Sequence, residues 1–486
     1  MTDAGPDVDE AAPPDVPARR RGGLRGVFRD PARTFLVLAI PFGVYLACVV
    51  PHFGGIDEPA HFYRAYQIST GTILPEKFGG SEFSGACIPI DVILARQRDS
   101  SVYAAHLRAI ADIPPDQHVP PITAASIPRC PTDHRQGLVT FSTFGSPIPY
   151  LPQAAAILVT RGLGFNVDGM EIAARLATLA TFVALVWFAI RRATRSKWAF
   201  AAVGLLPLAL FQSSSSPSHD VVTIAVALLV VSSALRVLDA PPDASRTALI
   251  VEAAVLTTVL AACKPGYVVL AGCYLLPLFG PRRRRDLWPL ACTPVLGALV
   301  SLAWNNVVGG LWKTDAGLFG VEVDPERQRH LLVTEPWTFA GAVVHTMVDY
   351  VWDWSKSLIT IGVSVSVWPT VAVAASLLVV GAVSLQRTGR EPEGLAWSQR
   401  IILVIVFVIG ALLVFGAQYV YWTTPGDNAV EGMQARFFVP LLVLVPIAVG
   451  TVPWRWARST TARIPVALGL VPVYVALAVT IAFRMY

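Results

Sequence analysis

The residues best suited to chemistry lie in one short run, residues 57–66, whose sequence is DEPAHFYRAY. The run begins six residues after Pro51, where an apolar segment of about one membrane span ends. Two adjacent carboxylates are therefore predicted at a membrane surface. A carboxylate can take a proton from a substrate or hold a metal ion. We predict that Asp57 is the catalytic base or a metal ligand, and that Glu58 assists or orients it.

The same run also supports a structural interpretation. Pro59 suits the first position of a helix, and either Asp57 or Glu58 could cap that helix. Capping accounts for one carboxylate but not for two. On a helix that begins near Pro59, His61 and Arg64 lie three residues apart and share a face. Asp57 joins this face if the turn extends back to it, so we predict that His61 and Arg64 bind substrate.

Further polar residues interrupt the apolar sequence, and each also has a simpler interpretation. The turn at residues 213–220, SSSSPSHD, could be a polar connection in which one residue caps the next helix. Lys264 is a lone cation between two apolar segments, and its ammonium could extend to lipid headgroups. Arg175 and Arg436 each begin an apolar segment and could mark an interface. Their shared depth favours substrate binding, which we predict for Arg175, His219, Asp220, Lys264 and Arg436.

These residue types fit the transfer of a sugar from a lipid phosphate. The head group of a lipid-linked donor lies at the outer membrane surface, and transfer of its sugar leaves a polyprenyl phosphate whose charge needs nearby Arg or Lys side chains. The acceptor hydroxyl needs a carboxylate as a general base or as a metal ligand. A divalent cation such as Mg or Mn could bind at Asp57, although the sequence shows no complete oxygen shell around it.

The elements that must hold these residues are membrane helices. The chain has 486 residues, of which 54% are hydrophobic and 15% are charged, and its mean hydropathy is +0.56. A soluble protein usually has about 25% charged residues. We therefore predict an all-α integral membrane protein with about 11 transmembrane helices and no basic–aromatic stripe for nucleic acid. The predicted spans are 34–51, 168–190, 198–215, 219–237, 248–263, 266–281, 288–305, 357–386, 398–421, 436–450 and 463–484.

Basic clusters set the predicted orientation. Residues 1–33 have the composition of a disordered cytoplasmic tail, and residues 34–486 form the transmembrane domain. With this set of spans the arginine clusters, such as Arg191 and Arg192 after the second span, all face the cytoplasm, as the positive-inside rule requires. The C-terminus then lies outside the cell, as does a large first loop at 52–167.

One segment of that loop has two interpretations. Residues 147–163 are apolar enough to span the membrane, but a span here would move the arginine cluster that follows it to the outer side. The charge pattern therefore favours a helix that lies on the outer membrane surface. Residues 338–353 suggest a second interfacial helix.

Cysteine usage agrees with this layout. Cys87 and Cys130 both lie in the first outer loop, where a disulfide is permitted, and we favour a bond between them over two free thiols. The other cysteines lie in or beside apolar spans and are predicted to be inert packing residues. No C-x-x-C or zinc-ligand spacing occurs in the sequence.

Several signatures of other functions are missing from the sequence, which has no P-loop, dinucleotide glycine fingerprint or H-E-x-x-H motif. A nucleotide-sugar donor is disfavoured, because the unexplained ionisable residues lie opposite the cytoplasm. Two other function classes stay open. A transporter or flippase of lipid-linked glycans needs ionisable residues deep in its spans, and the clearest candidate, Glu252, lies near a cytoplasmic end. A non-catalytic subunit of an envelope glycan assembly machine would use the outer loop to bind partners.

Short stretches of the chain resemble those of a known family. Residues 57–66 closely match D-E-P-x-H-x-x-R-A-Y, and residues 264–267 (KPGY) match K-P-x-Y. Residues 149–150 (PY), 174–176 (ARL) and 434–440 (QARFFVP) resemble a P-x-Y helix, an A-R-L span start and Q-G-R-Y-F-x-P. On these stretches the chain resembles the bacterial membrane-protein family labelled domain of unknown function 2142. It more distantly resembles the GT-C glycosyltransferases, which use polyprenyl- or dolichyl-phosphate sugars.

The resemblance implies a GT-C-like fold with its site on the first outer loop. In GT-C enzymes an acidic pair at the start of this loop supplies the catalytic aspartate, which points to Asp57. It also implies a bacterial plasma-membrane protein whose partners are a polyprenyl-phosphate-linked sugar, membrane lipid and an envelope glycan acceptor. The chain departs from the family pattern at His219, where Pro is usual, and at Ala435 and Phe437, where Gly and Tyr are usual.

Overall fold

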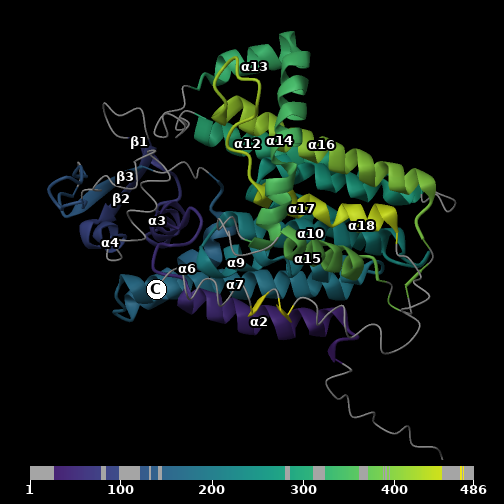
Figure 1. Cartoon of the computed structure of the whole chain (residues 1–486), viewed down its shortest axis with the longest axis horizontal. Helices are drawn as coiled ribbons and strands as arrows, with labels where there is room; N and C mark the ends of the chain where they lie inside the picture. The colour runs from purple at the N-terminus through teal and green to yellow at the C-terminus, as the bar shows by residue number, and fades with distance from the viewer. Residues whose placement is uncertain are drawn as a thin grey trace, which may run out of the picture.

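The computed structural model places most of the chain in helices, with one small sheet (Figure 1). It describes residues 27–77, 84–97, 121–130, 133–140, 145–279, 285–309, 323–360, 370–386, 388, 391–392, 394–450, 471–472 and 474–475. Most of the predicted tail at 1–33 lies outside the described residues, and α2 (Pro31–Val49) begins within its last residues. Nearly all of the predicted span 463–484 also lies outside them.

Among the described residues, six helical segments are long and apolar enough to cross a membrane. They are α2, α7 (Val167–Arg192), α10 (His219–Leu238), α11 (Arg246–Cys263), Asp286–Val308, which joins η3 (Arg285–Cys292) to α12 (Thr293–Val308), and α16 (Trp397–Trp422). A bent pair, α8 (Lys197–Gly204) and α9 (Pro207–Ser215), makes a seventh span if its 53° bend is included. The prediction of a helical membrane protein is confirmed, whereas the number of eleven spans is not.

Three further predicted spans are not matched by one long helix. A span needs about 20 residues, but η2 (Pro265–Leu278) has 14. Residues 435–449 are divided into η6 (Ala435–Phe438), α17 (Val439–Leu442) and α18 (Leu444–Val449). Prolines lie in both segments, and proline removes a helical hydrogen bond. The predicted span 357–386 contains the end of α14 (Pro336–Thr360) and the whole of α15 (Thr370–Ser384), and residues 361–369 between them lie outside the described residues.

α10 is the centre of the bundle. In its apolar stretch 89% of the residues are buried inside the protein, against 28–44% in the other five spans. α7, α11 and η2 pack around it. The outer helices expose apolar side chains instead, such as Val404, Ile405 and Val408 of α16. A contiguous apolar surface of this kind is suited to lipid rather than to water.

The chain between α2 and α7 forms a small folded unit at one end of the bundle, which we call the outer-loop unit (Figure 1). Its elements are α3 (Glu58–Ser69), β1 (Glu76–Lys77), β2 (Ser84–Pro89), α4 (Ile90–Ala95), β3 (Gln136–Thr140), η1 (Ile148–Tyr150) and α6 (Leu151–Gly162). The central strand β2 pairs antiparallel with β1 and β3. Cys87 of β2 forms a disulfide with Cys130, and their Cα atoms are 5.8 Å apart.

The two predicted interfacial segments are helical. α6 lies within 147–163 and has 12 residues, so it is about 18 Å long and too short to cross a bilayer. Its exposed side chains include Leu151, Leu158 and Val159. α14 contains residues 338–353 and follows α13 (Pro325–Thr334). The position of both helices on a membrane surface stays a prediction.

Charged residues of the bundle collect near its two ends. At one end Glu252 of α11 contacts Arg192 of α7 and Arg236 of α10. At the other end, beside the outer-loop unit, Arg175 lies in the N-terminal half of α7 and Asp220 lies in the first turn of α10. About 24 Å of helix separates Asp220 from Arg236, so the two groups do not share partners.

Candidate functional site

The turn that joins α2 to α3 places Asp57 in an unfavourable backbone conformation. Asp57 has φ 53° and ψ 18°, which is left-handed backbone that non-glycine residues adopt at an energetic cost. Phe53 in the same turn has φ 57°. Gly55 must stay a glycine, because a Cβ atom would overlap the carbonyl oxygen of Ser215 at the end of α9. Backbone strain of this kind gathers at functional sites, where the surrounding packing enforces it.

Neither carboxylate of the turn caps α3. Asp57 occupies the N-cap position, but its side chain makes no hydrogen bond to the helix. Glu58 Oε2 accepts from the backbone N–H of Gly55, which precedes the helix, at 2.9 Å. The capping alternative is therefore wrong for both residues, and each carboxylate has other partners.

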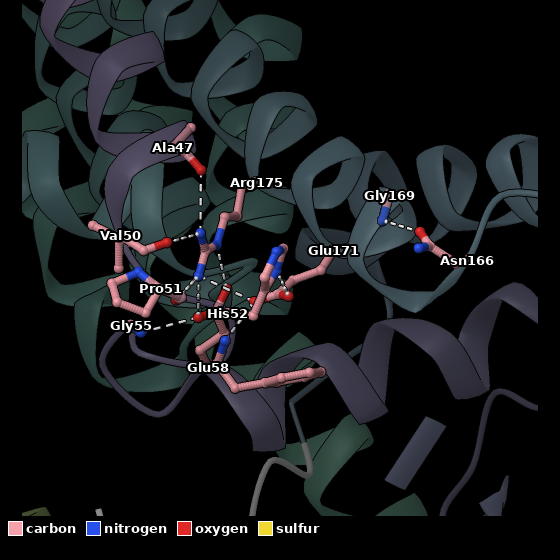
Figure 2. A network of polar contacts seen from close by, with 11 residues as sticks. Ala47, Val50, Pro51, His52, Gly55, Glu58, Asn166, Gly169, Glu171 and Arg175 are labelled. Carbon is pink, nitrogen blue, oxygen red and sulfur yellow. Dashed lines mark hydrogen bonds and ion pairs between the residues drawn. The ribbon is translucent and has the colours of Figure 1, made fainter. Parts of the chain in front are cut away.

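Glu58 belongs to a buried group that we call the Arg175 network, which comprises Arg175, Glu58, Glu171 and His52 (Figure 2). Arg175 Nε donates to Glu58 Oε1 at 2.6 Å, and Arg175 Nη2 donates to Glu58 Oε2 at 2.7 Å. Arg175 Nη2 also lies 3.0 Å from Glu171 Oε1, and His52 Nδ1 lies 2.6 Å from Glu171 Oε2. The side chains of Arg175 and Glu58 are 1% and 0% exposed.

The network fixes the end of α2. The other N–H groups of Arg175 donate to three carbonyl oxygens, those of Ala47 at 3.1 Å, Val50 at 2.7 Å and Pro51 at 2.8 Å (Figure 2). The last carbonyl groups of a helix have no partner inside it, so the guanidinium supplies what the helix lacks. Every donor of Arg175 is used, and the turn that carries Asp57 is held at its first residue.

Burial makes the Arg175 network a structural group. It raises the pKa of Glu58, although the ion pair with Arg175 opposes the shift. Two carboxylates share one guanidinium, and His52 adds a second positive charge when it is protonated. The pKa of His52 is raised because its ring hydrogen-bonds to Glu171. Glu58 and Arg175 were predicted as catalytic and substrate-binding groups, but their side chains contact each other rather than an open surface.

Asp57 faces a second group, the Asp57 cluster, which comprises Asp57, Asp220, Lys264 and Arg436. Arg436 Nη2 lies 2.5 Å from Asp57 Oδ2, and Arg436 Nε lies 3.9 Å from Asp220 Oδ2. Lys264 Nζ lies 2.7 Å from Asp220 Oδ1. The four residues come from the α2–α3 turn, the start of α10, the end of α11 and η6. Predicted site residues that are distant in sequence therefore meet at one end of the bundle.

The Asp57 cluster balances two acids with two cations, but it is open on one side. The side chain of Asp57 is 49% exposed, whereas that of Arg436 is 9% exposed. Burial raises the pKa of Asp57, but the charge of Arg436, its hydrogen bond and the nearby His61 together outweigh this effect and lower the pKa below its ordinary value. The Phe437 ring lies 5.0 Å from Lys264 Nζ and 5.2 Å from the Arg436 guanidinium carbon. Asp57 is thus an ionised and accessible carboxylate at neutral pH.

Asp220 is also held by a ring of four hydrogen bonds and one ion contact, which we call the Tyr150 ring. The Tyr150 hydroxyl lies 2.8 Å from His61 Nδ1 and 2.9 Å from His219 Nδ1. Ser218 Oγ lies 3.1 Å from His61 Nε2, and it accepts from the backbone N–H of Asp220 at 3.1 Å. His219 Nε2 lies 3.4 Å from Asp220 Oδ1 and closes the ring.

One arrangement of protons satisfies the Tyr150 ring when Asp220 is ionised. The nearby Asp220 carboxylate favours a proton on His219 Nε2, and in that tautomer His219 Nδ1 accepts from Tyr150. The Tyr150 oxygen then accepts from His61 Nδ1, and His61 Nε2 accepts from the Ser218 hydroxyl. Burial lowers the pKa of His61 to about 4, which agrees with a neutral imidazole. The ring therefore orients Asp220, and through it Lys264.

Comparison with known proteins identifies a family for the chain. The chain matches a family described as "Predicted membrane protein (DUF2142)" over residues 40–445. The chain belongs to this family. The matched range contains the whole Arg175 network, Asp57 cluster and Tyr150 ring. No curated protein and no solved structure matches the chain. Family membership therefore establishes a membrane protein and names no activity.

Two further residues of the DUF2142 chain that were predicted to bind substrate, Arg64 and His61, contact neutral side chains and backbone groups. Arg64 contacts neither charged group: its Nη1 donates to Gln67 at 2.6 Å, and its Nη2 donates to the carbonyl of Ile73 at 2.8 Å. His61 is 3% exposed and contacts Tyr150 and Ser218, so it supports the site from the protein interior. Both residues anchor α3 within the outer-loop unit.

Sequence reasoning missed the centre of the Tyr150 ring and half of the Arg175 network. Tyr150 had a signal, because it follows Pro149 in one of the stretches that resemble the family. Ser218 caps α10, as one interpretation of its turn allowed, and its hydroxyl also contacts His61. Glu171 precedes Arg175 by four residues, a spacing that places both on one helix face.

The described residues do not form a divalent-cation site. Among them, no group of three or more His, Cys, Asp or Glu side chains is placed to hold a metal ion. In the Asp57 cluster both carboxylates already contact cationic side chains, and Lys264 and Arg436 would repel a further cation. The donor set around Asp57 therefore does not fit Mg or Mn.

Proposed function

We propose that this chain is a GT-C-type membrane glycosyltransferase that moves a sugar from a polyprenyl-phosphate donor to a cell-envelope acceptor at the outer face of the membrane. The observation that carries the proposal is the meeting of Asp57, a half-exposed carboxylate, with Arg436 and Lys264 at one end of the bundle. One site thereby offers a base for the acceptor hydroxyl and two cations for the donor phosphate.

The proposed reaction needs few groups. The acceptor hydroxyl oxygen attacks C1 of the donor sugar, and its proton passes to Asp57. The bond between C1 and the phosphate oxygen breaks, and the oxygen keeps the electron pair. The leaving polyprenyl phosphate gains a negative charge, which Arg436 and Lys264 stabilise. Both cations are fixed in advance, Arg436 by Asp57 and Lys264 by Asp220.

Arg436 also couples donor binding to the base. In the free protein its charge holds the pKa of Asp57 below the ordinary value. A donor phosphate that draws the guanidinium toward itself weakens this contact, so the pKa of Asp57 rises and the carboxylate becomes a better proton acceptor. The base is then most effective when the leaving group is in place.

The proposal places the outer-loop unit outside a bacterial plasma membrane and the N-terminus in the cytoplasm. Lipid-linked donor would approach between the helices, and the acceptor would approach from the outer side. Glu252, the residue that most favoured a transporter, is held by Arg192 at 2.6 Å, by Arg236 and by the Ser233 hydroxyl at 2.7 Å. This arrangement favours a structural role for Glu252.

The test is Asp57→Asn, which keeps the size of the side chain and removes the base. Membranes that contain the wild type or the variant receive radiolabelled undecaprenyl-phosphate glucose, mannose or galactose, and label in the envelope glycan fraction is counted. We expect a fall of about 100-fold or more in transfer, the usual contribution of a general base. Asp91→Asn is the matched control, because Asp91 is an exposed carboxylate in α4 of the same outer-loop unit.

Two results would reject the proposal. One is unchanged transfer by Asp57→Asn that is inserted in the membrane in normal amounts. The other is wild-type transfer no greater than that of membranes without the protein, for every donor in the panel.

A further inference from the structure

Buried polar side chains without partners gather at the end of α9. Gln212 is 1% exposed, and Ser215 and Ser216 are 0% exposed. Among the described residues, neither the oxygen nor the nitrogen of the Gln212 amide has a hydrogen-bond partner, and the hydroxyls of Ser215 and Ser216 have none. The neighbouring hydroxyls of Ser213 and Ser214 both donate to the carbonyl of Leu210. Polar groups left unpaired in a protein interior are rare and call for an explanation.

The unpaired groups lie next to the Asp57 cluster. Leu208 and Phe211 of α9 pack in one cluster with Ile56 and Ala435, the neighbours of Asp57 and Arg436. Gln212 follows Leu208 by four residues, and Ser215 follows Phe211 by four, so all four share one face of α9.

Contacts with the turn before Asp57 give the same placement. The carbonyl of Ser215 lies so close to Gly55 that no Cβ atom fits between them. The chain then runs from Ser216 to Ser218, whose hydroxyl contacts His61. Arg436 itself has a buried Nε without a hydrogen-bond partner among the described residues. The unpaired atoms of α9 and of Arg436 therefore belong to two elements that both contact the turn at Asp57.

The chemistry of these atoms selects a class of ligand. An amide and two hydroxyls offer neutral donors and acceptors close together, which match neighbouring hydroxyl groups better than a charge or a hydrocarbon chain. The charges needed for a phosphate are supplied separately by Lys264 and Arg436. We propose that Gln212, Ser215 and Ser216 form a subsite for the hydroxyl groups of the donor sugar, an inference that rests on the proposed function.

The test compares two lipids that differ only in the sugar. The probes are undecaprenyl phosphate and the undecaprenyl-phosphate hexose that wild type binds most tightly in a panel of glucose, mannose and galactose. Equilibrium binding is measured on full-length protein in nanodiscs. For Gln212→Met and Ser215→Ala we expect the affinity for the hexose lipid to fall about tenfold or more, and the affinity for undecaprenyl phosphate to stay within about twofold. Ser213→Ala, which removes a paired hydroxyl from the same helix, should leave both affinities within about twofold.

A second measurement is independent of turnover. Replacement of an unpaired buried amide by an apolar side chain of similar shape removes its desolvation cost, so the thermal midpoint of ligand-free Gln212→Met should rise by about 1–3 °C. An equal loss of affinity for both lipids would overturn the subsite, as would a fall in the midpoint, which would mean that Gln212 is satisfied by bound water. If Asp57→Asn abolishes transfer while Gln212→Met binds normally, the subsite fails and the proposed function stands. If wild type binds neither lipid, both fail.

Discussion

Asp57 and Glu58 are adjacent in the chain and have opposite surroundings. Glu58 is wholly buried, and both of its oxygens accept hydrogen bonds from Arg175. Asp57 is half-exposed and contacts the guanidinium of Arg436, which lies in η6. The left-handed backbone at Asp57 separates the two carboxylates, so that one faces the Arg175 network and the other faces the Asp57 cluster.

The two arginines show what this difference means. Every N–H group of Arg175 has a protein acceptor, so a ligand could bind it only by displacing a bond that holds the fold. Arg436 keeps a buried Nε without a hydrogen-bond partner among the described residues, and its ion pair with Asp57 reaches a half-exposed carboxylate. The extent to which a buried cation is satisfied therefore separates a positioning group from a binding group.

The largest effect expected from this comparison is on stability. Arg175→Met leaves Glu58 and Glu171 buried without their cation and leaves the carbonyl groups at the end of α2 without their donor, which should cost about 3–5 kcal/mol. We expect Arg436→Met to cost about 1 kcal/mol or less, because Asp57 stays solvated and Asp220 keeps Lys264. Denaturant unfolding in detergent micelles measures both variants.

A similar loss of stability in the two variants would remove the distinction between the two regions. A double variant sharpens the comparison further. In Arg175→Met/Glu58→Gln one buried charge is removed with its partner, so part of the lost stability should return. No recovery would show that the carbonyl groups of Ala47, Val50 and Pro51, and not the ion pair, carry the contribution of Arg175.

A smaller effect is expected where the Tyr150 ring supports the Asp57 cluster. Tyr150→Phe removes one hydroxyl, leaves His61 and His219 each with an unpaired ring nitrogen, and loosens Asp220 and Lys264. We expect the KM for the lipid-linked donor to rise about tenfold, the equivalent of about 1.4 kcal/mol. Tyr66→Phe is the control, because Tyr66 lies on α3 in the same unit and its contact with Arg161 is made by the ring, which phenylalanine keeps. If both variants raise KM equally, the ring has no special role in positioning Lys264.

Residue type and depth were enough to predict part of the site. Asp57, Lys264 and Arg436 stood out as charged residues at the edges of apolar segments, and the structure brings them together through Asp220. Long apolar helices could be predicted equally well from the sequence, because an uninterrupted apolar stretch of this length usually spans a membrane. Segments broken by proline, such as η2, were read as full spans from composition alone.

The different surroundings of Asp57 and Glu58 could not be predicted from the sequence. It depends on a backbone conformation at Asp57 and on Arg175, which lies more than a hundred residues away in the chain. The contacts of Arg64 could not be predicted for a related reason, because the carbonyl of Ile73 that it bonds lies in a turn with no regular pattern. Contacts between distant irregular segments leave no periodic signal.

The smallest expected effect concerns pH at the edge of the Arg175 network. The pKa of His52 is raised in the folded protein, mainly by its hydrogen bond to Glu171. A raised pKa means that protonation favours the folded state: the stabilisation is complete below the unfolded pKa of about 6.5 and is lost as the pH rises through the folded value.

His52→Gln keeps a donor to Glu171 but takes no proton, so the wild type should exceed it in thermal midpoint near pH 5 and approach it near pH 9. The difference should be small, because the His52 side chain is 37% exposed. A gap that is constant across this range would mean that His52 contributes its hydrogen bond and shape alone, and the second positive charge of the Arg175 network would have to come from elsewhere.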